Sequence, residues 1–158
     1  MDVVRAESVS SMKQAIDKIL PATDVLIMAA APADFRPSAP ASQKIKKAAA
    51  ATPQPIELTE TEDILNATKS ARKPGAVVVG FALETENLVA NSAKKLEEKG
   101  LDMIVANSAV DEGTGFGVDT NRVTILSAGG SSEEIAMMKK SEVAEVILDR
   151  IEALLNER

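Results

Sequence analysis

The chain has 158 residues, a formal net charge of -6 and no Cys, His, Trp or Tyr. The absence of Cys and His excludes disulfides, a catalytic thiol, an imidazole base and a Cys/His zinc site. The acidic balance argues against general nucleic-acid binding. No apolar run reaches the ~18 residues of a membrane span, and no signal-peptide pattern is present. A cytoplasmic protein that binds neither nucleic acid nor membranes is therefore expected.

The first part of the chain predicts two strands and a helix. Asp2–Ala6 predicts a short strand. A helix follows, capped by Ser10 or Ser11 and ended by Pro21. Its apolar residues recur at i, i+3, i+4, i+7 and i+8, which is typical of an amphipathic helix: Met12, Ala15, Ile16, Ile19 and Leu20. Val25–Ala29 is then an apolar run of strand length.

The middle of the chain begins with a long segment, Ala31–Thr52, that is rich in Ala, Ser and Pro. Segments of more than ~15 residues without regular structure are usually functional or disordered. Ile56–Leu58 predicts a short strand, and Thr61 is expected to cap a helix that runs to about Ser70. The β-branched run Ala76–Phe81 predicts a central parallel strand.

The last part of the chain alternates helices with strands. The expected elements are a helix over Glu86–Lys99 with Gly100 as its C-cap, strands over Met103–Ala106, Arg122–Leu126 and Ile135–Met138, and a helix from Ser141 to about Leu155. Gly129 and Gly130 are expected to turn a hairpin between the last two strands. This order predicts a single α/β domain over residues 1–158, with a Rossmann-like, doubly wound, mostly parallel sheet and a C-terminal β-hairpin and helix.

The residues that follow Val25–Ala29 favour a nucleotide site. In open α/β sheets ligands bind just past the carboxyl end of a strand. Small residues there let the backbone approach a base, Asp34 can accept hydrogen bonds from a hydroxyl, and the lysines at positions 44, 46 and 47 can contact phosphates. The alternative is a strand that leads into a solvated loop, with Asp34 capping a turn and the lysines at the surface.

Other residues permit either a functional or a purely structural role. Lys95 and Lys99 lie on one side of their helix, as many surface lysines do. Phe81 ends a strand and is either core or a contact to a base. Glu62–Leu65 open a helix whose first N–H groups suit a ligand oxygen. The Gly113–Gly117 loop fits neither standard glycine fingerprint, and we interpret it as a loop that contacts another subunit or changes position.

Four ordered stretches together resemble the phosphopantothenate–cysteine ligase family. They are Ala29–Pro37 (AAAPADFRP), Lys44–Lys47 (KIKK), Val78–Thr85 (VVGFALET) and Leu101–Asn107 (LDMIVAN). Four motifs in order are far more specific than one. In bacteria this ligase is often the C-terminal half of a bifunctional coenzyme A biosynthesis protein, whose other half is a decarboxylase.

The resemblance implies ligation of cysteine to 4′-phosphopantothenate through an acyl-cytidylate. CTP is the nucleotide, Mg²⁺ its companion, and FMN is expected only in a fused decarboxylase domain. The family forms homodimers, so a homodimer is expected. The resemblance implies that Lys44 is catalytic. Because an acyl-cytidylate must be shielded from water, we expect the segment Ala31–Thr52 to act as a lid. The CTP-binding positions that it implies are Met28, Ala29, Ala30, Asp34, Lys44, Glu62, Asp63, Ile64, Leu65, Phe81, Lys95 and Lys99.

One departure from the family concerns the start of the chain. The ligase family begins with a glycine-rich strand and loop, followed by a stretch that contains a functional asparagine, and nothing similar precedes Asp2. We therefore interpret the chain as a truncated CTP-binding ligase domain whose own turnover is in doubt. The alternative is a non-catalytic nucleotide-binding or oligomerisation module. A generic dinucleotide-binding protein is disfavoured because no G-x-G-x-x-G follows a strand.

Overall fold

The computed structural model describes residues 1–44, 55–110, 114 and 117–158. Five strands form its main sheet: β1 (Val25–Met28), β4 (Val77–Glu84), β5 (Met103–Ser108), β6 (Thr120–Ser127) and β7 (Ser132–Lys139). They lie in the order β1-β4-β5-β6-β7; the first three are parallel, and the last two form an antiparallel hairpin. The α/β class and the C-terminal hairpin are therefore confirmed.

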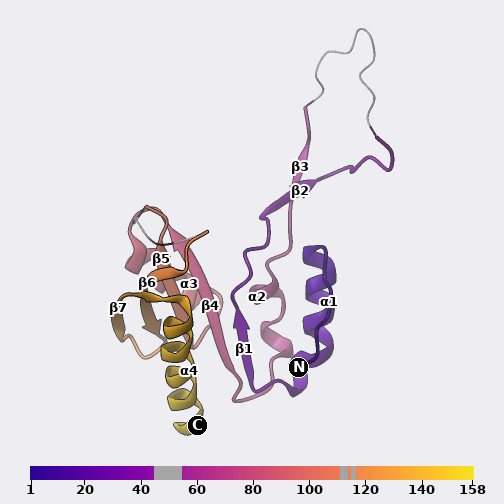
Figure 1. Ribbon diagram of the computed structural model, residues 1–158. Helices are drawn as coiled ribbons and strands as arrows, with labels where there is room; N and C mark the ends of the chain where they lie inside the picture. Colours follow the sequence, from indigo (N-terminus) through magenta and orange to yellow (C-terminus); the bar gives the residue numbers. More distant parts are fainter. Residues whose placement is uncertain (45–54, 111–113, 115–116) are drawn as a thin grey trace.

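Helices cover both faces of this sheet (Figure 1). On one face α4 (Lys140–Asn156) buries Val143, Ile147 and Ile151 against alternate residues of β4 and β5, such as Val79 and Val105. The other face is covered by α1 (Val9–Ile19), α2 (Ile64–Ala67) and α3 (Leu88–Glu98). Since successive strand residues point to opposite faces, the apolar run of β4 supplies both cores at once.

Two short strands form an arm that projects from the body of the molecule (Figure 1). β2 (Phe35–Pro37) pairs antiparallel with β3 (Leu58–Glu60). The expectation that residues 31–52 form a long loop is therefore wrong for Phe35–Pro37. The expected strand over Ile56–Leu58 is shifted, because the pairing with β2 places it at Leu58–Glu60. Residues 45–54, in the proposed lid, lie outside the described residues.

Some local expectations are wrong for reasons that the hydrogen bonds make plain. Asp2–Ala6 is irregular, because no strand in the described part of the chain pairs with it. Helix α1 is capped by Ser8, whose side chain accepts the N–H of Ser11 while the Ser11 hydroxyl accepts the N–H of Ser8. A strand needs a partner edge, whereas a cap needs only its own turn.

The caps of α2 and α4 also differ from expectation. Thr61 does not cap α2, because its N–H donates to the Asp34 carbonyl (2.8 Å) and its hydroxyl to the Ala33 carbonyl, at the base of the arm. Asp63 is the cap instead. Helix α4 begins at Lys140, where the Glu142 carboxylate accepts the N–H of Lys139 at 2.8 Å, so Ser141 lies within the helix.

Two further observations concern residues near the ends of α3 and α4. Gly100 has φ +55°, which confirms a left-handed residue after α3. Leu155, near the end of α4, is 39% exposed. No helix in the described residues combines the length and apolarity needed to span a membrane.

Candidate functional site

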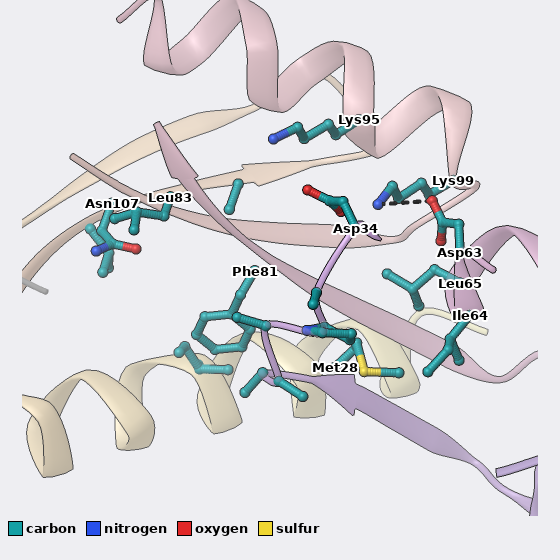
Figure 2. A pocket seen from close by; sticks show the side chains of 18 of the residues that line it. Met28, Asp34, Asp63, Ile64, Leu65, Phe81, Leu83, Lys95, Lys99 and Asn107 are labelled. Carbon is teal, nitrogen blue, oxygen red and sulfur yellow. Dashed lines mark ion pairs between the residues drawn. The ribbon is translucent and has the colours of Figure 1, made fainter. Parts of the chain in front are cut away.

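A pocket of about 660 Å³ opens at the carboxyl ends of β1 and β4. The residues after β1 form part of its wall, from Ala29 to Asp34, and the start of α2 forms another part. Phe81 and Leu83 of β4 reach it from the face that α4 covers (Figure 2). This edge of a parallel sheet is where open α/β folds bind ligands.

Nearly all of the residues that the family resemblance singles out line this pocket. They are Met28, Ala29, Ala30, Asp34, Glu62, Asp63, Ile64, Leu65, Phe81, Lys95 and Lys99. They come from the end of β1, the base of the arm, the start of α2, β4 and α3. Residues that are more than fifty positions apart in the sequence therefore share one cavity, because the parallel strands end at one edge.

Lys95 of α3 and Lys99, the residue at its C-cap, line the pocket, and each is paired with an acid from another element. Lys99 Nζ lies 3.1 Å from Asp63 Oδ2, at the start of α2 (Figure 2). Lys95 Nζ lies 2.6 Å from Glu84 Oε1, at the end of β4. Helical spacing of four places both lysines on one side of α3. Each ammonium group is thereby held near the cavity by its partner.

Asp63 has three contacts that favour its ionised form. Its Oδ1 accepts the backbone N–H of Asn66, its Oδ2 accepts the side-chain amide of Asn66, and Lys99 lies beside it. Partial burial opposes ionisation, but the Asn66 N–H and Lys99 together outweigh it, so the pKa of Asp63 lies below its usual value. The start of α2 is thus already capped by the Asp63 side chain. Because α2 has only four residues and carries this cap, it does not support the expectation that its first N–H groups bind a ligand.

Arg72 fixes the distance between the two helices that frame this end of the pocket. Its guanidinium donates to the carbonyls of Leu65 (2.7 Å), Lys99 (3.1 Å) and Gly100 (2.5 Å). One planar side chain therefore ties the end of α3 to α2. No sequence pattern indicates this role, because the partners of Arg72 are backbone carbonyls.

Asp34 lies at the root of the arm, exposed and within the pocket lining. Its carbonyl accepts the N–H of Thr61, which fixes the backbone at that point. Within the described residues its carboxylate has no hydrogen bond that would make it a turn cap. The carboxylate is therefore positioned to accept hydrogen bonds from a ligand.

Lys44 is the exception among the predicted residues. It is exposed on the arm, beyond β2, and does not line the pocket. The lysines at positions 46 and 47 lie outside the described residues, as does most of the Gly113–Gly117 loop. Of the expected group of lysines, the structure brings together Lys95 and Lys99.

The pocket is also lined by polar residues that are not among the expected site residues. Asn107 lies one residue before the end of β5, Asn121 is the second residue of β6, and Lys140 begins α4. The side-chain oxygen of Asn121 is buried with no hydrogen-bond partner among the described residues. Asn107 was inside a quoted family motif and at a strand end, and that position could have identified it. Asn121 and Lys140 depend on the antiparallel hairpin, whose placement the sequence does not reveal.

The described residues contain no group of three or more acidic side chains that could hold a metal ion. Within this part of the chain, the expected Mg²⁺ therefore has no such group of carboxylates to bind it. Mg²⁺ that accompanies nucleotides is held largely by phosphate oxygens and water, so the expectation rests on the nucleotide alone.

Comparison with known proteins gives a consistent result. A model of the DNA/pantothenate metabolism flavoprotein C-terminal domain matches residues 1–155. The chain is 38% identical over 153 residues to the coenzyme A biosynthesis bifunctional protein CoaBC of Bacillus subtilis, covering 97% of this chain and 37% of that protein. It is also 38% identical over 156 residues to a cysteine/cysteine sulfinic acid decarboxylase from an unknown prokaryotic organism, covering 99% of this chain and 43% of that protein. The chain thus spans less than half the length of these relatives.

A solved structure agrees with the sequence comparisons. The C-terminal domain of CoaBC matches with a TM-score of 0.78 at 33% sequence identity, covering 98% of this chain and 66% of that one.

Proposed function

The chain belongs to the family of DNA/pantothenate metabolism flavoprotein C-terminal domains, and on that basis we propose that it is the CTP-binding part of a phosphopantothenate–cysteine ligase. Membership in this family, which includes the C-terminal domain of CoaBC, connects the chain with coenzyme A biosynthesis. We propose, beyond family membership, that the chain binds CTP and takes part in the ligation reaction.

One observation carries the proposal: every residue that the family resemblance assigns to CTP, except Lys44, lines a single pocket. The backbone after Met28 is free of bulky side chains and can read the edge of a base. Asp34 can accept hydrogen bonds from the sugar, and Lys95 and Lys99 can contact phosphate oxygens. Phe81, 39% exposed, offers an apolar surface to the ligand.

The proposed reaction has two steps. A carboxylate oxygen of phosphopantothenate attacks the α-phosphorus of CTP, and pyrophosphate leaves as the bond from that phosphorus to its bridging oxygen breaks. The amine of cysteine then attacks the acyl carbon, loses a proton, and displaces CMP. Because negative charge moves to the leaving group in each step, fixed cations such as Lys95 and Lys99 can stabilise the transition state without an imidazole base.

A non-catalytic role remains the second candidate, since the chain covers only part of its relatives. The pocket alone could bind a nucleotide for assembly or regulation within a longer protein. CTP binding without pyrophosphate release in the presence of phosphopantothenate would select this candidate over the ligase.

Isothermal titration with CTP and with ATP, each with Mg²⁺, tests the proposal. We expect tighter binding of CTP, because the backbone groups of Met28–Ala30 contact the base edge, where the two bases differ. A matched titration with cytidine separates the contribution of the base from that of the phosphates. Equal affinity for the two triphosphates, or no binding of either, would remove the assignment.

A further inference from the structure

Glu84 is a buried carboxylate beside the pocket that the proposed reaction does not use. It ends β4 and points to the face covered by α3, with its side chain only 10% exposed. Its Oε1 accepts from Lys95 Nζ at 2.6 Å, and its Oε2 accepts from the side-chain amide of Asn91 at 3.2 Å. Both oxygens of the carboxylate are thus engaged by residues one turn apart on α3.

Backbone hydrogen bonds hold Glu84 and Asn91, the two partners in this cluster with Lys95, in place. The Glu84 carbonyl accepts the N–H of Ala109 at 2.8 Å, which anchors the end of the strand. The amide of Asn91 also donates to the carbonyl of Glu86 at 3.0 Å, so Asn91 is itself held in place. A buried carboxylate without a partner is costly, so Glu84 retains its cation strongly.

Lys95 is the partner that faces the cavity. Its side chain is 42% exposed and lines the pocket. An ammonium group has three donors, and Glu84 takes one of them, which leaves donors for ligand oxygens. A lysine that is held by a fixed acid has already lost the rotamer freedom that ligand binding would otherwise have to remove.

A neighbouring pair on the same helix shows that this arrangement is not a general property of α3. Lys94 and Glu98 form an ion pair at 3.7 Å, with side chains that are 73% and 57% exposed. Neither residue lines the pocket. Such exposed pairs contribute little and orient nothing toward a ligand.

We propose that Glu84 is a positioning residue, which, together with Asn91, holds the Lys95 ammonium at the pocket wall so that it is ordered in advance for a polyphosphate. The ligand class, a chain of phosphates, rests on the proposed function. The role of Glu84 itself rests on the geometry of the cluster. Glu84 acts through Lys95 and makes no contact with the ligand.

Three variants test this role: Glu84→Gln, Lys95→Met and the double variant. The probes are inorganic triphosphate, CTP with Mg²⁺, and cytidine. In the native background we expect Glu84→Gln to weaken binding of both phosphate-bearing probes by about 3- to 10-fold, the usual range for the ordering of one long side chain. Binding of cytidine, when it is detectable, should stay unchanged.

Whether Glu84→Gln weakens or strengthens triphosphate binding in each background shows how Glu84 acts. In the Lys95→Met background, Glu84→Gln should leave triphosphate binding unchanged or strengthen it, because a negative charge beside the ligand is removed. A purely structural role predicts weaker binding in both backgrounds. A carboxylate that merely competes with the ligand predicts stronger binding in the native background. Either result would overturn the proposal.

Two further variants keep the test decisive. Asn91→Ala loosens Glu84 while leaving its charge, so it should weaken triphosphate binding in the same direction by a smaller factor, and an unchanged affinity would count against the proposal. Glu98→Gln removes the exposed pair on the same helix and should have no effect on any probe. Thermal unfolding of each variant shows whether it is folded.

The outcome for CTP and the outcome for Glu84 can be told apart. When inorganic triphosphate binds and depends on Glu84 through Lys95, the positioning role stands even where CTP shows no advantage over ATP. When CTP binds selectively but Glu84→Gln has no effect, the proposed function stands and the positioning role falls.

Discussion

The charged side chains that line the pocket are acids and bases in equal number. Asp34, Glu62 and Asp63 face Lys95, Lys99 and Lys140. Such a site does not attract anions by net charge, so selectivity for a phosphate-bearing ligand depends on where each charge is fixed. The ion pairs of Lys95 and Lys99 supply that placement, since each fixes an ammonium group relative to the sheet edge.

Asp34→Ala tests whether the acid at the root of the arm contacts the ligand. Its carboxylate is exposed and its carbonyl, which the substitution keeps, makes the bond to Thr61. We expect CTP binding to weaken by about tenfold, in line with about 1.5 kcal/mol for a hydrogen bond to a charged group. The free energy of unfolding should change by less than ~0.5 kcal/mol. Calorimetry and chemical unfolding measure the two effects, and a large loss of stability would instead support a turn-cap role.

Whole elements with a strong hydrophobic period were predictable from the sequence, whereas their ends were not. The runs that became β4, β5 and α4 carry their signal in many residues, so an error at one position does not matter. A cap depends on one side chain and one turn. Ser8, Ser10 and Ser11 are chemically alike, and only the hydrogen bonds of the folded turn single out Ser8.

Replacing Ser8 with Ala tests the observed cap of α1. The variant loses the acceptor for the Ser11 N–H and the reciprocal bond between the two hydroxyls. We expect it to lower the free energy of unfolding by about 1 kcal/mol. Ser10→Ala is the matched control, because Ser10 is exposed inside the helix, and it should be close to neutral. Equal effects of the two changes in urea unfolding would show that Ser8 is no better a cap than Ser10.

The site became visible only at the scale of the whole molecule. Sequence motifs named most of its residues, but periodicity could not show that the end of β1 and the side of α3 border one cavity. That fact follows from the parallel pairing of β1 with β4. Asn121 and Arg72 were not predictable from the sequence, because Asn121 lies at the pocket only through the placement of the antiparallel hairpin, and the partners of Arg72 are backbone carbonyls, which every sequence contains.

The arm separates Lys44 from the pocket, and this separation leads to a specific expectation for catalysis. Because Lys44 is exposed and does not line the pocket, Lys44→Gln should leave the equilibrium affinity for CTP within about twofold. The free energy of unfolding should change by less than ~0.5 kcal/mol, as is usual for exposed substitutions. Lys95→Met should weaken that affinity clearly, since Lys95 lies at the cavity.

Lys44→Gln should slow the chemical step much more than it weakens CTP binding, when Lys44 acts as the family resemblance implies. Charge builds on the departing pyrophosphate in the transition state, so a cation that acts there contributes more to the rate than to binding. Loss of such an electrostatic contact commonly costs ~10²–10³ in rate. The measurement is pyrophosphate release from CTP and phosphopantothenate, before cysteine is added, in a longer protein that carries this domain and turns over. Release at the unaltered rate would return Lys44 to the role of a solvated surface lysine, and stabilisation of the leaving group would then fall to lysines that line the pocket, such as Lys95 and Lys99.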